Sequence, residues 1–361
     1  MKKKLSLFCV LLVFVSSFTY SSDYKFLFGA LGMHEDQLAG IGPTYLDIGI
    51  GKTDVTFIEG NSTEFQFYLG GGTEKRKLWN SKSDGSNAAS HLFAVDLIRA
   101  DWEFGIKQGF FSDVLTASLS YDGIFEYFKD GATLGDNTYY PDLSGDNNLG
   151  SYFTGGLELN FMLDDMFIQD GFLAKTEVAY APLTLNKFIG KSDFYSANLE
   201  INYAKTIKLK KAYDTERNLF SLVLVDRFVT NYTDGSCVPT YYRNQISLGR
   251  KVRGFSNFSY NNKLTFVNNL DLRVSVFELD EIKFARIFPR FNFFLDAGYG
   301  MLEYVNTSTS ENNLIASTGV QATLCISDFA SLGYQFAYII AGDNFENGTS
   351  SVGSLVLMLD F

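Results

Sequence analysis

Apolar and polar residues alternate along much of this chain, and the pattern is clearest in its last residues. In the segment 351–361, Leu355, Leu357, Leu359 and Phe361 fall on one side, and the other side is more polar. Successive side chains of a β-strand point to opposite faces, so the pattern predicts a strand with one apolar face. Such a strand invites aggregation at a soluble edge, whereas in a membrane barrel one face meets lipid and the other the lumen.

The same period of two recurs along the whole chain, and no helical period of useful length competes with it. Clear examples are residues 153–163, 197–203 and 264–276. The pattern predicts fourteen strands, at residues 24–34, 43–58, 63–77, 91–106, 113–126, 151–163, 171–184, 193–209, 218–230, 263–277, 287–300, 314–326, 329–341 and 351–361. Residues 24–58 could instead form three or four shorter strands.

The predicted connections alternate between short and long, which favours a barrel over a β-sandwich. Short ones are 59–61, 107–112, 164–170 and 327–328, and longer polar ones include 78–90 and 129–150. An even number of antiparallel strands returns both chain ends to one side, so the short connections would be periplasmic and the long ones extracellular. The sequence therefore predicts an all-β fold, a transmembrane antiparallel β-barrel without a domain break.

The N-terminus predicts export from the cytoplasm. Three lysines precede the apolar stretch 5–15, which is shorter than a comfortable membrane span, and small or polar residues follow. We interpret residues 1–21 as a signal peptide and 22–361 as the barrel domain. Cys9 lies inside the apolar stretch and is interpreted as one of its hydrophobic residues. No later segment is apolar enough to predict a transmembrane helix, which leaves a secreted protein or a β-barrel.

The amino-acid composition fits a membrane barrel and limits the kinds of partner that the chain can bind. The chain has 35 Phe and 21 Tyr but only five Pro, which suits strands and the aromatic girdles of a membrane barrel. A net charge of −11 argues against nucleic acid as a partner. Cys237 and Cys325, expected in a loop and a strand, do not form a disulfide framework. Lys208, Lys210 and Lys211, which precede acidic residues, lie beside an expected periplasmic turn, and we interpret them as a solvated turn in preference to a lipid-headgroup or partner site.

The connection 231–262 is the longest, and it contains a basic, glycine-rich and aromatic cluster at 249–255. The next two strands each carry one aspartate on the polar face, Asp271 and Asp296. A carboxylate in a narrow lumen needs a cationic partner, and one arginine can bridge two carboxylates. We therefore expect the loop to fold into the barrel and Arg253 to bind both aspartates. Gly254 would allow a tight turn, and Phe255 would pack against the wall.

These residues resemble a known family. The segment Val252-Arg253-Gly254-Phe255 is similar to the lumen-loop motif of the BamA/TamA-like superfamily, or bacterial surface antigens. The segments 239–244, 269–272 and 294–298 also fall where members carry similar sequences. The resemblance implies that Arg253 engages Asp271 and Asp296. It also implies sixteen strands, so we expect a barrel of 14–16. Terminal strands that end in Phe are likewise typical of outer-membrane proteins, whose assembly machinery would recognise Leu355, Leu357, Leu359 and Phe361.

The resemblance implies a bacterial outer-membrane protein that assists the insertion or transport of polypeptides. Members carry periplasmic modules before the barrel, for which this sequence has no room after residue 22. Separate periplasmic proteins would then be partners, besides the lipid bilayer, the assembly machinery and client polypeptides. A passive pore or structural surface protein with a loop-plugged lumen is the alternative. The binding by Arg253 could be purely structural or could couple to gating.

We expect no enzyme activity, metal site or cofactor. His34 and His91 are the two histidines, and no grouping with Ser and Asp suggests hydrolysis.

Overall fold

The computed structural model describes the chain as a set of long strands and their shorter turns. The described residues are 25–30, 45–55, 57–79, 92–128, 147–165, 167–186, 192–211, 218–239, 242, 248–255, 262–277, 287–303, 310–326, 330–342 and 351–359. The predicted signal peptide at 1–21, both histidines and Phe361 lie outside these residues.

Strands make up almost all of the described structure. Their bounds are β1 Lys25–Ala30, β2 Tyr45–Val55, β3 Thr63–Trp79, β4 Leu92–Phe110, β5 Leu115–Phe128, β6 Asn147–Asn160, β7 Leu163–Asp165, β8 Ile168–Ala181, β9 Asp193–Lys211, β10 Asn218–Cys237, β11 Asn262–Val276, β12 Ile287–Glu303, β13 Ser310–Ile326, β14 Ala330–Ala341 and β15 Ser351–Leu359. Two short helices are α2 Leu183–Asn186 and α4 Leu248–Lys251. Within the described ranges, no helix is both long and apolar enough to cross a bilayer.

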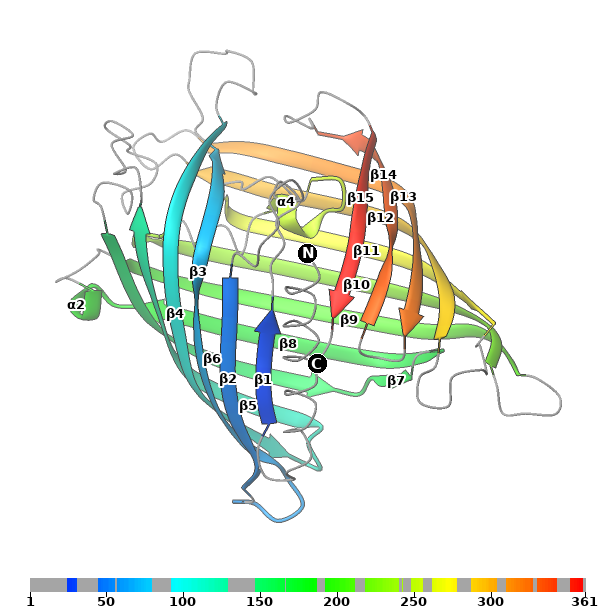
Figure 1. Ribbon diagram of the computed structural model, residues 1–361, viewed down its shortest axis with the longest axis horizontal. Helices are drawn as coiled ribbons and strands as arrows, with labels where there is room; N and C mark the ends of the chain where they lie inside the picture. The colour runs from blue at the N-terminus through cyan, green and yellow to red at the C-terminus, as the bar shows by residue number, and fades with distance from the viewer. Residues whose placement is uncertain are drawn as a thin grey trace, which may run out of the picture.

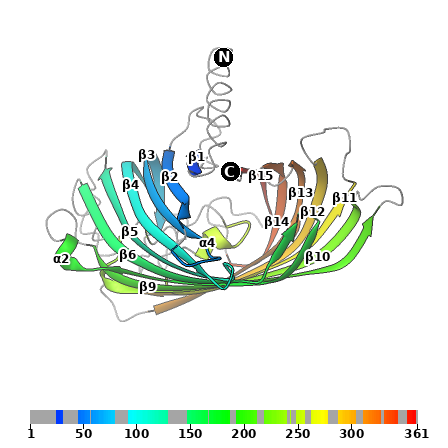
Figure 2. The same cartoon turned by 90° about the horizontal axis from the view of Figure 1, so that it is seen from below.

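The strands form one antiparallel sheet in which neighbours in sequence are neighbours in space. The order runs from β1 to β15, with β7 off this path because it pairs only with β8. The sheet curls around a central space, the lumen, and brings its first and last strands toward each other (Figures 1 and 2). Among the described strands, no ladder joins β1 to β15, so the sheet is not closed. The predicted antiparallel β-barrel is confirmed, with fourteen strands on the path.

The outer face of the sheet is apolar. Aromatic and aliphatic side chains alternate with inward-facing residues and remain more than a third exposed, as in a surface that meets lipid rather than water. Members of this outer face are Phe65, Phe67, Leu69, Phe104, Leu119, Phe153, Leu157, Val178, Leu199, Ile201, Phe291, Phe293, Leu295, Val320, Leu332, Tyr334 and Phe336. The inner face carries the buried polar residues, among them Asp271, Asn292 and Asp296.

The two ends of the barrel differ in their connections. At the short-turn end, residues 56–62, 111–114 and 327–329 link adjacent strands, and at the long-loop end 80–91, 129–146 and 238–261 do so. Two short turns are bound to each other, because the Ser62 N–H donates to Asp113 Oδ1 at 2.8 Å and the Ser112 N–H to Asn61 Oδ1 at 2.9 Å. The predicted alternation therefore holds over most of the sheet.

Several predicted strand ends are wrong, because the strands continue beyond the segments in which apolar and polar residues alternate. β10 continues to Cys237, so this cysteine lies in a strand, and the longest connection begins after it rather than at residue 231. β9 continues two residues beyond the predicted end, to Lys211, so Lys210 and Lys211 lie in the strand together with Lys208 rather than in the turn. Both Cys237 and Cys325 are buried thiols.

Candidate functional site

The segment 248–255 of the longest connection lies inside the curled sheet. It consists of α4 and a tight turn closed by a hydrogen bond of 3.1 Å from the Phe255 N–H to the Val252 carbonyl. Both views show α4 on the concave side of the sheet (Figures 1 and 2). The segment therefore reaches back from the long-loop end into the lumen, as the sequence predicted.

Arg253 binds two carboxylates that project from adjacent strands. Its Nε and backbone N–H donate to Asp296 Oδ2 at 2.7 and 2.9 Å, and its Nη2 donates to Asp296 Oδ1 at 2.6 Å. The same Nη2 donates to Asp271 Oδ1 at 2.5 Å. Asp296 is fully buried and Asp271 is 8% exposed. Paired carboxylates at this depth need a cation, and the forked guanidinium satisfies both.

The guanidinium of Arg253 also lies against the face of the Phe294 ring. Arg253 Cζ lies 3.9 Å from the centre of this ring, a distance at which a cation and an aromatic face attract each other. Burial lowers the pKa of the Arg253 guanidinium, but the hydrogen bonds to Asp296 and the charge of Asp271 outweigh this effect and raise its pKa. Arg253 therefore remains charged, and its bonds are charge-assisted.

Backbone contacts hold the loop close to the wall. Asn269 Nδ2 donates to the Lys251 carbonyl at 2.9 Å, and Ser317 Oγ donates to the Arg253 carbonyl at 2.5 Å. Gly254 has φ +90°, which a residue with a side chain rarely adopts. A Cβ on Gly298 would lie 2.6 Å from Leu248 Cδ1, so a side chain there would push α4 away from β12.

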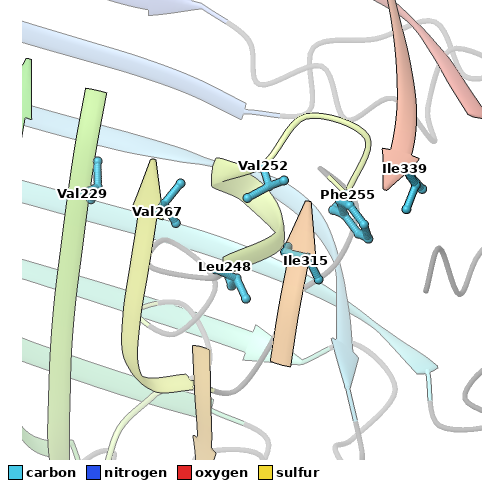
Figure 3. Close-up of a cluster of buried hydrophobic side chains, with 7 residues drawn as sticks. All are labelled: Val229, Leu248, Val252, Phe255, Val267, Ile315 and Ile339. Carbon is cyan, nitrogen blue, oxygen red and sulfur yellow. The ribbon is translucent and has the colours of Figure 1, made fainter. Parts of the chain in front are cut away.

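An apolar cluster surrounds the loop tip. Leu248, Val252 and Phe255 from the loop are at most 1% exposed, and they pack against residues of the inner wall. The close-up in Figure 3 shows these side chains gathered between the loop and the strands. The wall residues are Val229 of β10, Val267 of β11, Ile315 of β13 and Ile339 of β14. Val352 of β15 packs against the same cluster, so the loop links central strands to the last strand.

The same connection also contacts the wall on the other side of β10. The ring of Tyr242 lies 4.4 Å from that of Phe194 and 5.7 Å from that of Tyr152, measured between centres. Burial raises the pKa of the Tyr242 phenol to about 12. Lys251 interacts electrostatically with Glu200 and Glu177 on that wall. The connection is therefore attached to both sides of the lumen.

A second segment folds inward at the short-turn end. Phe167, between β7 and β8, is fully buried and lies 4.5 Å from Phe288 of β12 between ring centres. Cys325 of β13 completes the cluster. Arg273 Nη1 also donates to Gln169 Oε1 at 3.0 Å, which ties the start of β8 to β11. We call residues 167–169 the inward arch, because Phe167 and Gln169 contact β12 and β11 across the inner face of the sheet.

The structure brings Arg253, Asp271 and Asp296 together and packs Val252 and Phe255 against the wall beside Gly254. Leu355 and Leu357 lie opposite Tyr334 and Leu332 in the register of β14 and β15, and these two β14 residues belong to the outer face. Leu359 lies opposite Ala330. The sequence analysis treated residues 164–170 as an ordinary turn and missed the inward arch. An apolar Phe167 after two aspartates was the available signal.

The comparisons with known proteins agree with this architecture. Neither the protein-family models nor the curated proteins include a match to the sequence. A crystal structure of BamA from Haemophilus ducreyi lacking POTRA domains 1-3 is similar, with TM-score 0.52 and 13% identity over 87% of this chain. The fold is that of a BamA-like β-barrel. This chain covers 62% of the length of the BamA chain, so the match supports the barrel fold and does not extend to the activity or partners of that protein.

Proposed function

We propose that this chain is an outer-membrane β-barrel that assists the insertion or transport of other outer-membrane polypeptides. The apolar outer face supports the membrane location, because a surface of so many exposed aromatic side chains favours lipid over water. The resemblance of fold to BamA supports the bacterial outer membrane as that location. The proposed partners are the lipid bilayer, the assembly machinery, client polypeptides and separate periplasmic proteins.

The observation that carries the assembly role is the open seam between β1 and β15. No ladder joins these two strands in the described part of the chain, so each has one edge that pairs with no other described strand. An edge strand is a template on which another strand can pair. The loop packs on Val352 of β15, so its position in the lumen is physically coupled to this edge.

Photo-crosslinking tests this proposal in growing cells. A photo-reactive amino acid at position 357 in β15 should crosslink to newly exported outer-membrane polypeptides, because it lies next to the edge. The matched control is position 320, which faces outward from β13, a strand paired on both sides. Crosslinks of equal yield from both positions, or from neither, would contradict an assembly role for the seam.

A passive pore is the second candidate, and the charge of the inner wall favours it. Glu103 of β4 lies directly opposite Asp122 of β5. Glu177 of β8 is close enough to interact electrostatically with both. Lys107 and Lys175, which pairs with Glu177 at 3.2 Å, offset part of this negative charge, and the remainder attracts mobile cations. Such a wall would let small cations pass more readily than anions.

Planar-bilayer recordings separate the two candidates. If the chain assists assembly and is plugged by its loop, the conductance should be small and fluctuating, and deletion of residues 245–260 should raise it severalfold. A steady conductance that selects cations in the intact chain would favour the pore. No change on deletion would argue that the loop does not obstruct the lumen.

A further inference from the structure

The short-turn end of β9 carries a row of lysines on a chain whose net charge is −11. Lys208, Lys210 and Lys211 are exposed, and no described residue forms an ion pair with them. Lys205, the first of the row, pairs with Asp170 at 2.8 Å. We call Lys205, Lys208, Lys210 and Lys211 the lysine strip. An acidic protein that gathers cations at one place has a local concentration of positive charge, which attracts anions.

A β-bulge decides which way the strip faces. Val223 of β10 lies opposite Thr206, but the next residue, Leu222, lies opposite Lys208, so Ile207 is an extra residue in β9. A bulge shifts the alternation of side chains beyond it by one position. Strict alternation would have sent Lys208 and Lys210 into the lumen.

The neighbours of the strip agree with an outward orientation. Ser221, which faces inward and is fully buried, lies opposite Leu209. Leu209 packs against the buried cluster of Phe167 and Phe288. Since Leu209 points into the lumen, Lys208 and Lys210 on either side of it point outward. The bulge therefore places Leu209 in the inner cluster and, at the same time, Lys208 and Lys210 on the outer face.

The lysine strip continues the apolar outer face toward the short-turn end. On the same strand, Leu199, Ile201 and Tyr203 face outward and are 36–46% exposed. Ile207, 56% exposed, directly precedes Lys208, and Lys210 follows two residues later. Strands rise by about 3.3 Å per residue, so the outer face changes from apolar to cationic within roughly 10 Å between Ile207 and Lys210. This distance is comparable to the boundary between the hydrocarbon core and the headgroups of a bilayer. The lysines then lie at the height of the lipid phosphates.

We propose that the lysine strip binds the headgroups of anionic phospholipids in the leaflet at the short-turn end. This inference rests on the proposed membrane location. Lys208 and Lys210 supply outward ammonium groups that no described residue pairs with, whereas Lys205 is already engaged by Asp170 and Lys211 lies opposite the buried Asn218, on the inner side of the alternation. Their aliphatic stems lie along the apolar wall while the charged ends reach the phosphates. Each lysine near an anionic membrane surface adds attraction, and the attraction weakens as salt increases.

Native mass spectrometry with added dioleoylphosphatidylglycerol tests the proposal. The strip variant Lys208→Gln, Lys210→Gln should bind this lipid at least about tenfold more weakly than the wild type. Binding of dioleoylphosphatidylcholine, which has no net charge, should be weak for both proteins. The matched control is the double variant Lys107→Gln, Lys175→Gln, which removes positive charge from the inner wall and should bind as the wild type does.

Heat-modifiable mobility on unboiled gels verifies that each variant is folded, and vesicle flotation verifies insertion. An inserted strip variant that binds phosphatidylglycerol within twofold of the wild type would overturn the lipid site alone. A control variant that loses binding as strongly as the strip variant would also overturn it. A wild-type chain that stays outside vesicles would instead refute the membrane location and the proposed function with it.

Discussion

Replacing Asp296 by alanine is expected to lower the free energy of unfolding by about 3 kcal/mol. The carboxylate is fully buried and accepts three hydrogen bonds from Arg253. Breaking a buried ion pair typically costs about 3–5 kcal/mol, and Asp271 still holds Arg253, which favours the lower value. Urea unfolding in detergent, followed by tryptophan fluorescence, measures the change. Arg253→Ala should act in the same direction and lower the temperature at which the folded gel band disappears.

The matched control is Arg227→Ala, at another arginine that binds a carboxylate inside the barrel. Arg227 donates two hydrogen bonds to Glu200, but its side chain is 44% exposed. Exposed ion pairs contribute about 0–1 kcal/mol, so this variant should unfold close to the wild type. If both variants lost the same stability, or if Asp296→Ala lost none, the loop would not be bound as the structure indicates.

Replacing Phe167 by alanine is expected to destabilise the barrel by about 3 kcal/mol and to loosen the inward arch. The ring is fully buried against Phe288 and Cys325, and removal of a buried phenyl leaves a cavity. Because the arch joins the start of β8 to β11 and β12, its release should also make residues 167–169 accessible to protease. Limited proteolysis and urea unfolding measure the two effects.

Phe111→Ala is the control for this variant, because Phe111 also lies in a short turn but is 77% exposed. Its loss should change the free energy of unfolding by about 0.5 kcal/mol or less. A protease pattern and an unfolding midpoint of Phe167→Ala that equal those of the wild type would show that the arch is dispensable.

The sheet was largely predictable from the sequence because its signal is local. Outward residues such as Phe291, Phe293 and Leu295 alternate with inward Asn292, Phe294 and Asp296, and this period needs no knowledge of other strands. Boundaries were less predictable, since β10 continues to Cys237 beyond the apolar pattern. Backbone pairing with β9 keeps that extension in the sheet, and the composition of neither strand predicts this pairing.

The lumen loop was predictable for a different reason. A buried carboxylate requires a cation. Because Asp271 and Asp296 lie on inner faces, they predict a cationic partner, and Arg253 in the long connection can be that partner. Two contacts that stabilise this arrangement were not predicted. They are the Phe294 ring against the guanidinium and the close approach of Gly298 to α4. Their roles depend on how closely two backbones approach.

The sequence by itself determined the alternation of faces, the apolar outer wall and the charge partners of the loop. These features follow from neighbouring residues or from the requirement to neutralise charge. Only the tertiary structure decided the inward arch at Phe167, the open seam and the bulge at Ile207. Each of these depends on the register and curvature of strands far apart in the chain, because packing across a lumen is a property of the assembled sheet.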